Sequence, residues 1–223
     1  MGKWMTSGVM RELVVGSEPR MGVMEAIRTR RSIGKVRPEQ PPREAIEQII
    51  EAGTWAPNHR LTEPWRFFVV AGEARRDFGK ALAARHIQEG QAEIAIKAAA
   101  KPLRAPVVIA VAVEPVVGPK VVEIEEVTAG AAAVQNMLLA AHALGLAAIW
   151  RTGAPAYDPA VKAFFGLAPS AYLLGFVYVG YPDAVVPERG RVPVAEVTRW
   201  LGWVDDEDAG DEERPVGIPV VER

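Results

Sequence analysis

The sequence predicts a single domain in which helices cover a sheet of about four strands. The chain has 223 residues, of which 49% are hydrophobic and 24% charged, a globular composition that excludes wholesale disorder. A β-branched run over 106–114 predicts a central strand. The segment Val127 to Trp150 carries no charged residue, which favours a buried helix followed by a buried strand.

The first half of the chain contains three expected helices and one strand. The helix over 23–31 would turn Val23, Met24 and Ile27 inward. A second helix is opened by Pro41 and Pro42, carries an apolar face and is stopped by Gly53; that face is formed by Ala45, Ile46, Ile49 and Ile50. A turn-rich stretch follows over 54–64, then a strand over 66–71 and a charged surface helix over 73–88.

The second half predicts the central strand, a long buried helix and two further strands. The long helix covers 122–144, and strands are expected at 146–151 and 173–180 with a short helix at 159–165 between them. The uncharged segment is long enough to span a bilayer, but Gln135, Asn136 and His142 lie within it and Gly145 interrupts it. A helix in a soluble domain is therefore favoured, and a second subunit would supply part of its cover.

Composition limits the classes of function. The chain has no cysteine, which excludes disulfide scaffolds, thiolate metal sites and cysteine nucleophiles. The net charge of −2 gives no general attraction to nucleic acid or to an anionic membrane, and no partner of either kind is expected. The first twenty residues lack a continuous apolar stretch, so a cytoplasmic protein is expected. We expect an N-terminal extension over 1–20, the domain over 21–202 and an acidic tail over 203–223.

The sequence Arg30-Arg31-Ser32 is the first candidate for a functional site. Two guanidinium groups match phosphate oxygens bidentately, and a hydroxyl adds a donor. The alternative is a basic helix end that the helix dipole favours. A nucleic-acid arm is the weaker option, because no aromatic residue lies between these charges.

Two further segments combine polar residues with turns. Asn58 and His59 lie in a proline-bounded loop, where they would bind the edge of a heteroaromatic ring or simply shape the turn. Trp150, Arg151 and Thr152 follow a buried strand, where ligands often bind in helix-covered sheets, although a plain rim turn gives the same pattern.

Other chemistries lack the residues they need. The sequence has no phosphate loop, no G-x-G-x-x-G motif and no Gly-x-Ser-x-Gly elbow. The three histidines lack the spacing of a metal site, and His142 is expected in the core. Glu123, Glu125 and Glu126 are expected to form a solvated helix start. No acid–base pair is evident, so no catalytic side chain is assigned, as suits an enzyme whose cofactor carries the chemistry.

Taken in order, these pieces resemble the nitroreductase family of FMN-dependent oxidoreductases. The resemblance runs over about residues 21 to 202 and is closest to the short branch of the family. It rests on five segments: Arg30-Arg31-Ser32, Ala56-Pro57-Asn58-His59, Pro64-Trp65-Arg66-Phe67-Phe68-Val69, Trp150-Arg151-Thr152-Gly153 and Leu174-Gly175-Phe176-Val177-Tyr178-Val179-Gly180.

The resemblance implies an α+β fold, with a mostly antiparallel central sheet between helices and an intertwined homodimer that binds FMN at its interface. Arg30, Arg31 and Ser32 would hold the phosphate and ribityl end. Trp55, Asn58 and His59 would approach from the other subunit, and Trp150, Arg151 and Thr152 would pack by the isoalloxazine ring. Arg191 resembles a late phosphate-binding arginine more loosely. NADH or NADPH would reduce the flavin, and a nitroaromatic, a quinone or a similar small acceptor would reoxidise it by a ping-pong mechanism.

Two residues depart from the family pattern. Glu63 stands where many relatives have glutamine, and a carboxylate near the flavin would disfavour added electron density. Trp55 stands where close relatives can carry a basic residue, so its contact would be packing or stacking. A specialised member of the fold, such as a reductive dehalogenase or a flavin-fragmenting enzyme, and a flavin-binding protein without turnover are the alternative functions.

Overall fold

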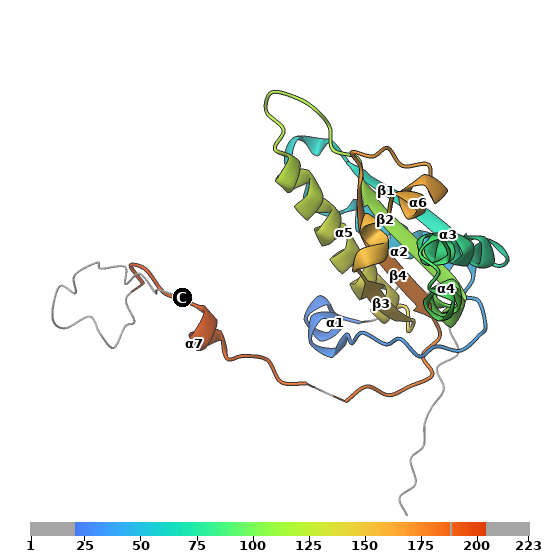
Figure 1. Cartoon of the computed structure of the whole chain (residues 1–223). Helices are drawn as coiled ribbons and strands as arrows, with labels where there is room; N and C mark the ends of the chain where they lie inside the picture. Colours follow the sequence, from blue (N-terminus) through green and yellow to red (C-terminus); the bar gives the residue numbers. More distant parts are fainter. Residues whose placement is uncertain (1–20, 188, 204–223) are drawn as a thin grey trace, which may run out of the picture. The chain divides into compact units, whose positions relative to one another are not determined.

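The computed structural model describes residues 21–187 and 189–203, and the chain divides into two units between Val186 and Pro187. The first unit contains a four-stranded sheet with helices on both faces (Figure 1). Its elements are α1 (Val23–Thr29), α2 (Arg43–Thr54), η1 (His59–Leu61), β1 (Trp65–Ala71), α3 (Ala74–Gln88), α4 (Ala92–Ala99), η2 (Lys101–Arg104), β2 (Val107–Val113), α5 (Glu123–Ala143), β3 (Ala147–Arg151), η3 (Ala154–Tyr157), α6 (Pro159–Phe164) and β4 (Tyr172–Gly180).

The strands follow the order β1-β2-β4-β3, and each neighbouring pair is antiparallel. The four predicted strands are thus confirmed, with ends shifted by one residue at most. All seven residues of β2 are buried, because strands pair with both its edges and helices cover both its faces. The α+β class inferred from the sequence is correct.

Two apolar clusters lie on the opposite faces of the sheet. On one face, Val108, Ala110 and Ala112 of β2 belong to the cluster that includes Phe78 of α3 and Val161 of α6. On the other face, the alternate β2 residues Val107, Ile109 and Val111 belong to a second cluster. That cluster includes Ile49 of α2 and Met137 of α5. The alternation follows from the two-residue period of a strand, and it places the two faces under separate sets of helices.

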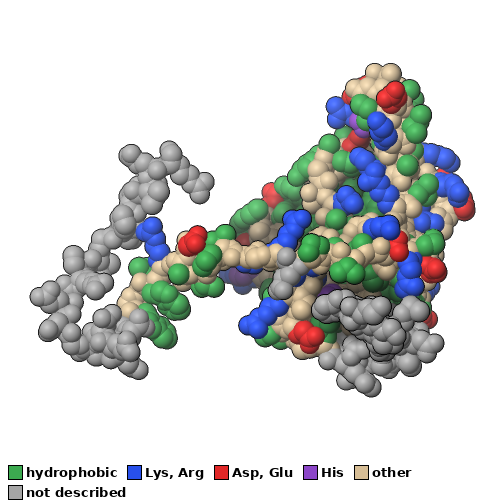
Figure 2. Space-filling model, turned by 90° about the horizontal axis from the view of Figure 1, so that it is seen from below, with side chains coloured by type: hydrophobic (Ala, Val, Ile, Leu, Met, Phe, Trp, Pro, Cys, Tyr) green, Lys and Arg blue, Asp and Glu red, His purple; other side chains and the backbone are tan. Residues whose placement is uncertain are grey.

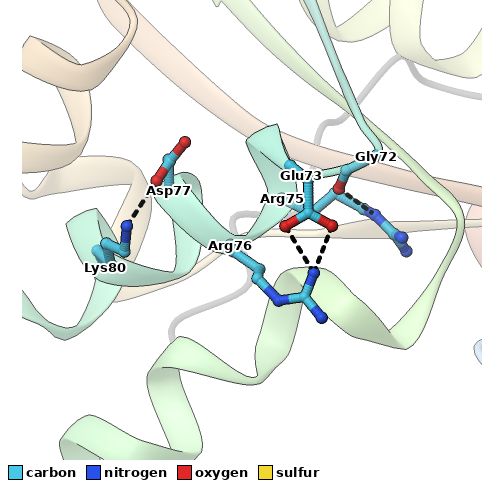
Figure 3. Close-up of polar contacts among 6 residues, drawn as sticks. All are labelled: Gly72, Glu73, Arg75, Arg76, Asp77 and Lys80. Atoms are coloured by element: carbon cyan, nitrogen blue, oxygen red, sulfur yellow. Dashed lines mark hydrogen bonds and ion pairs between the residues drawn. The ribbon is translucent and has the colours of Figure 1, made fainter.

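Helix α3 has a charged outer side and a buried apolar side. Arg76 bonds both carboxylate oxygens of Glu73 at 2.5 and 2.7 Å, and Lys80 pairs with Asp77 at 2.8 Å (Figure 3). The inner side buries Phe78, Gly79, Leu82 and Ala83. The surface position expected for this helix is therefore confirmed for one side only, because the side that carries these four residues faces the core.

Helix α4 packs against α3, and no element was assigned to this stretch from the sequence. A Cβ added at Gly79 would overlap the carbonyl oxygen of Ala99, so the glycine lets the two helices approach closely. The α4 segment is only eight residues long and buries just Ala95 and Ala98, whereas its larger apolar side chains Ile94 and Ile96 are exposed.

Helix α1 differs from its predicted orientation. Val23, Met24 and Ile27 are 67%, 56% and 49% exposed, whereas Ala26 is the buried residue of the helix. The prediction that these three side chains face inward is wrong for the single chain. Helix α1 packs on α5, and three apolar side chains remain outside that contact.

Helix α5 is buried along one side rather than all round. Ala133, Val134, Met137 and Ala141 are fully buried, whereas Gln135 is exposed. The helix packs on α2 and on the sheet, and its remaining side is at most half-buried by the residues that the structure describes. Within residues 21–187 and 189–203, no helix is both long and apolar enough to cross a bilayer.

Charges of both signs are exposed on the surface. Figure 2 shows many Lys and Arg side chains on one face, with Asp and Glu side chains and apolar groups among them. The second unit holds α7 (Val194–Val197), and its apolar side chains Val194, Val197, Trp200, Leu201 and Trp203 are all more than half exposed. Within this unit the rings of Trp200 and Trp203 are tilted toward each other at 5.4 Å.

Candidate functional site

The segment after α1 brings the first and third sequence motifs together. Ser32 forms a parallel bridge with Ala148 of β3, and the amide of Ile33 donates to the carbonyl of Ala148 at 3.2 Å. Two residues later, a Cβ added at Gly34 would lie 2.9 Å from Nη2 of Arg151. The chain from Arg30 to Gly34 therefore runs along the free edge of β3 and meets the arginine at its end.

Cationic side chains gather where α1 ends. Arg31 donates from Nη1 to the carbonyls of Arg28 and Arg30 at 2.6 and 2.9 Å, so its guanidinium folds back over the end of the helix. Nε and Nη1 of Arg30 and Nε of Arg31 are buried. These contacts agree with the basic helix end considered from the sequence, and the same charges create a positive potential beside β3.

His142 lies close to these positive charges. It is half-buried at the end of α5 rather than in the core, and its Nε2 lies 2.7 Å from Oγ1 of Thr29 on α1. Burial lowers the pKa of His142, and the nearby charges of Arg30 and Arg31 lower it further. The core position predicted for this histidine is wrong, because α1 covers only part of the ring.

The lowered pKa of His142 predicts a pH-dependent stability. The unfolded chain takes up a proton at the ordinary histidine pKa of about 6.5, whereas the folded chain does so only at lower pH. The free energy of unfolding should therefore fall as the pH drops through about 6.5, and it should level off below the folded pKa. Urea unfolding of wild type and His142→Gln in phosphate-free buffer measures this effect. As the pH falls, the wild type should lose free energy of unfolding relative to the variant, which lacks the imidazole. A difference in free energy of unfolding that does not depend on pH would contradict the prediction.

The end of β3 is shaped by a bulge in β4. Val111 pairs with Gly175 and Ala112 with Leu173, so Leu174 has no partner in that register. The free carbonyl of Leu174 accepts the indole Nε1 hydrogen of Trp150 at 3.1 Å. Gly175 has φ +129°, and a Cβ there would clash with the carbonyl of Arg151. Trp150 and the backbone of Arg151 are thus held in place by the bulge.

Arg151 lies over the ring of Tyr178, with Cζ 5.5 Å from the ring centroid. Its Nε is buried and makes no hydrogen bond within the described part of the chain. Burial raises the pKa of Tyr178, while the charges of Arg151 and Arg104 oppose that rise. Arg151 and Thr152 also line a small hollow of about 130 Å³, together with Leu82, Lys101, Arg104, Pro155, Phe176 and Tyr178. The lining carries three cations and no carboxylate, which suits an anionic group.

The second motif forms a turn between α2 and β1. Trp55 ends α2 and is 79% exposed, and His59 is exposed as well. The Asn58 side chain turns into the loop: its Oδ1 accepts the amide of Glu63 at 2.7 Å, and its Nδ2 donates to Thr62 Oγ1 at 3.1 Å. These hydrogen bonds support the turn-shaping role of Asn58 considered from the sequence.

Glu126 is buried beside this turn. Thr62 Oγ1 donates to Oε1 of Glu126 at 2.6 Å, and the amide of Val116 donates to its Oε2 at 3.3 Å. Glu126 is only 1% exposed, so the expectation of a solvated helix start is wrong for this residue, although Glu123 and Glu125 are exposed. Glu126 lies on the same side of α5 as the buried Ala129, Gly130 and Ala133, but only the fold brings Thr62 to it.

The candidate residues of one chain fall into two separate groups. The cationic group at Arg30, Arg31 and Ser32 adjoins His142 at the end of α5, whereas the turn of Asn58 and His59 adjoins Glu126 at its start. Glu126 and His142 are separated by about 24 Å at the helical rise of about 1.5 Å per residue. The first and third motifs meet within the chain, and the second lies at the other end of α5 (Figure 1).

Arg191 belongs to the second unit, where its Nη1 donates to the carbonyls of Arg189 and Gly190 at 3.3 and 3.1 Å. Both hydrogen bonds are to neighbouring residues of the same unit. Its relation to the cationic group stays a prediction.

Comparison with known proteins decides the family. A family model described as "Nitroreductase family" matches residues 27–181 of this chain. The chain belongs to the nitroreductase family. The match begins within α1 and ends just after β4, so it includes the sheet and both groups of candidate residues.

Two curated bacterial proteins that are named as NAD(P)H nitroreductases are similar to the chain. YdjA of Escherichia coli strain K12, whose name assigns it to the NAD(P)H nitroreductases, is 35% identical over 174 residues, covering 78% of this chain and 95% of YdjA. YfhC of Bacillus subtilis strain 168, named in the same way, is 29% identical over 176 residues, covering 77% and 90%. The similarity thus extends over nearly the whole length of both relatives.

Solved structures show the same fold. A nitroreductase-like family protein from Bacillus cereus superposes with a TM-score of 0.74 at 25% identity, covering 82% of this chain and 97% of that one. A nitroreductase homologue from Desulfovibrio desulfuricans, solved in complex with FMN, has a TM-score of 0.64 at 29% identity, covering 81% and 96%. The family suggested by the order of motifs in the sequence is therefore confirmed.

Proposed function

We propose that the protein is an FMN-dependent oxidoreductase that passes hydride from NADH or NADPH through the flavin to a small acceptor such as a nitroaromatic or a quinone. The observation that carries the proposal is the meeting of Arg30, Arg31 and Ser32 with Arg151 along the edge of β3. The name of YdjA as an NAD(P)H nitroreductase and the FMN bound to the Desulfovibrio protein support it.

The residues at the β3 edge fit the charge of FMN. The positive charges of Arg30 and Arg31, which add to burial in lowering the pKa of His142, favour a phosphate, and guanidinium groups bind phosphate bidentately. Arg30, Arg31 and Ser32 would hold the phosphate and ribityl end. Arg151, whose buried Nε lacks a hydrogen bond within residues 21–187 and 189–203, would lie with Trp150 and Thr152 by the ring system.

When bound, FMN supplies the redox chemistry, because it accepts hydride from NAD(P)H and passes electrons to the acceptor. The side chains bind, orient and stabilise charge. Arg151 would place fixed positive charge near the ring, where it stabilises added electron density. Trp150, anchored by the carbonyl of Leu174, would hold one wall of the site in place.

We further propose that the site is completed by a second subunit. Trp55, Asn58 and His59 lie at the far end of α5 from Arg30 and Arg31, too far for one chain to bring them to the same ring. A two-fold dimer packed along the uncovered side of α5 would bring the turn of one subunit to the cationic group of the other. It would also cover Val23, Met24 and Ile27, which are exposed on α1.

The dimer predicts that the FMN-loaded protein does not exist as a stable monomer. Light scattering across a dilution series should give the mass of two chains wherever the flavin remains bound. An FMN-loaded species with the mass of one chain at low concentration would contradict the shared site.

The function itself is tested by the absorbance spectrum of the purified protein. A bound flavin absorbs in the visible range, and addition of NADH or NADPH under anaerobic conditions should bleach it. An acceptor added afterwards should restore the colour. A flavin that NAD(P)H does not bleach would identify a binding protein without turnover, and protein that binds no FMN even on titration would overturn the proposal.

One site serving NAD(P)H and acceptor in turn predicts ping-pong kinetics. Initial rates at several acceptor concentrations should give parallel double-reciprocal lines against NAD(P)H, and converging lines would contradict this. Because no acid–base pair is assigned, His59→Asn should lower the rate only modestly, well short of the ~10²–10⁴-fold loss expected for a general acid or base. A loss of that size with FMN bound normally would show that His59 transfers a proton.

A further inference from the structure

Glu126 is the fully buried carboxylate beside the 55–64 turn, and the chemistry proposed above does not use it. It lies in the first turn of α5, where a negative charge is favourable, yet it is 1% exposed. A buried carboxylate is costly unless hydrogen bonds satisfy it. Here one oxygen accepts from the Thr62 hydroxyl and the other from the amide of Val116.

The turn that contacts Glu126 has an unusual backbone. Arg60, Leu61 and Glu63 have φ of 63°, 51° and 47°, in the left-handed region that residues with a Cβ rarely adopt. Such a backbone persists only where its surroundings hold it, and it is found most often at functional sites. Burial of these side chains does not hold the backbone in this conformation, because all three residues are exposed.

A chain of side-chain hydrogen bonds holds this backbone. Thr62, the residue between the left-handed positions, bonds Glu126 on one side and Asn58 on the other. Asn58 in turn accepts the amide of Glu63 at 2.7 Å, which closes the loop. Glu126 therefore links the turn to α5 and, through Val116, to the segment that follows β2.

We propose that Glu126 is a positioning residue for the cofactor site: acting through Thr62 and Asn58, it fixes the shape in which the turn presents Trp55 and His59 to the FMN bound by the partner subunit. The inference rests on the proposed function for the identity of the ligand. The hydrogen-bond chain itself lies within one subunit and exists without the flavin.

Three substitutions test the proposal. Thr62→Val removes the hydroxyl while keeping the shape of the side chain, and Thr62→Ser restores the hydroxyl. Glu126→Gln keeps the size of Glu126 but replaces one acceptor oxygen with a donor. Glu125→Gln is the matched control, since it makes the same change of charge at an exposed neighbour whose side chain makes no hydrogen bond within the described residues.

The first measurement is trypsin cleavage of the flavin-free protein after Arg60. Thr62→Val and Glu126→Gln should be cut at this bond about tenfold faster than wild type, because loss of one hydrogen bond shifts local opening by roughly that factor. Thr62→Ser and Glu125→Gln should be cut at the wild-type rate. If Thr62→Val is cut no faster than wild type, the hydrogen-bond chain does not hold the turn and the proposal is overturned, whatever the protein binds.

The second measurement is FMN affinity, with visible circular dichroism of the bound flavin. Thr62→Val should raise the Kd for FMN about tenfold and change the dichroism, because supporting contacts tune the groups that touch a ligand; Thr62→Ser should restore both. A loosened turn with unchanged Kd and dichroism overturns the positioning role. Absence of FMN binding in the wild type instead overturns the proposed function. The cleavage result still decides whether the hydrogen-bond chain holds the turn. Should Glu126→Gln fail to fold, the Thr62 pair decides both measurements.

Discussion

Replacing Arg30 or Arg31 with alanine is expected to weaken FMN binding by about 1.5–3 kcal/mol, the scale of a hydrogen bond to a charged group. Both residues lie where α1 meets the β3 edge, and their charges add to the effect of burial in lowering the pKa of the neighbouring His142. Titration of flavin-free protein with FMN, followed by quenching of flavin fluorescence, measures the change in Kd.

Arg28→Ala is the matched control for these variants. Arg28 is an exposed residue in the last turn of α1, just before Arg30 and Arg31, and its contact to Arg31 uses the backbone carbonyl, which the substitution keeps. Its affinity for FMN should stay close to that of the wild type. Wild-type affinity in both the Arg30 and Arg31 variants would remove these residues from the phosphate site, and an equal loss in Arg28→Ala would reduce their role to general electrostatics.

Phe78→Ala is expected to lower the free energy of unfolding by about 3–5 kcal/mol, the cost of a large cavity in a packed core. Phe78 is fully buried between α3 and the sheet. Its ring lies 5.5, 5.3 and 5.1 Å from those of Phe164, Phe165 and Phe176. Because these rings also pack on one another, the site cannot easily collapse after truncation.

Urea unfolding with saturating FMN in all samples measures this loss while keeping ligand stabilisation comparable. Val69→Ala on β1 serves as the control, since Val69 is 49% exposed and its truncation leaves no enclosed cavity. We expect the control to change stability by only about 0.5 kcal/mol. A loss below about 1 kcal/mol for Phe78→Ala would mean that the core around α3 repacks freely.

The sequence predicts most of the sheet and its covering helices because their patterns are long and regular. The β-branched run of β2 and the prolines before α2 are examples of strong local signals, whereas Gly53 does not stop α2, which continues to Thr54. Helix α4 was missed because it is short and buries only two alanines. The orientation of α1 was misread because an apolar side indicates burial without saying whether the same chain supplies the cover.

The candidate site is predictable only in part. The order of motifs identifies the family, and the fold brings the segment from Arg30 to Gly34 along β3 to Arg151. A glutamate at a helix start is usually exposed, so the sequence predicts a solvated Glu126, and its partner Thr62 is 64 positions away. The left-handed backbone at Arg60, Leu61 and Glu63 has no signal in the residue types, since no glycine marks it.

The separation of the two groups of residues along α5 has a genetic consequence for the proposed dimer. Each flavin site would take its cationic group from one chain and its turn from the other, so two different defective chains can complement each other. A chain with damaged arginines and a chain with a damaged turn would each be defective as homodimers. In the mixed dimer both defects fall on one site, and the other site is assembled entirely from intact parts. Co-expression of two inactive alleles would thus restore activity that neither allele has alone.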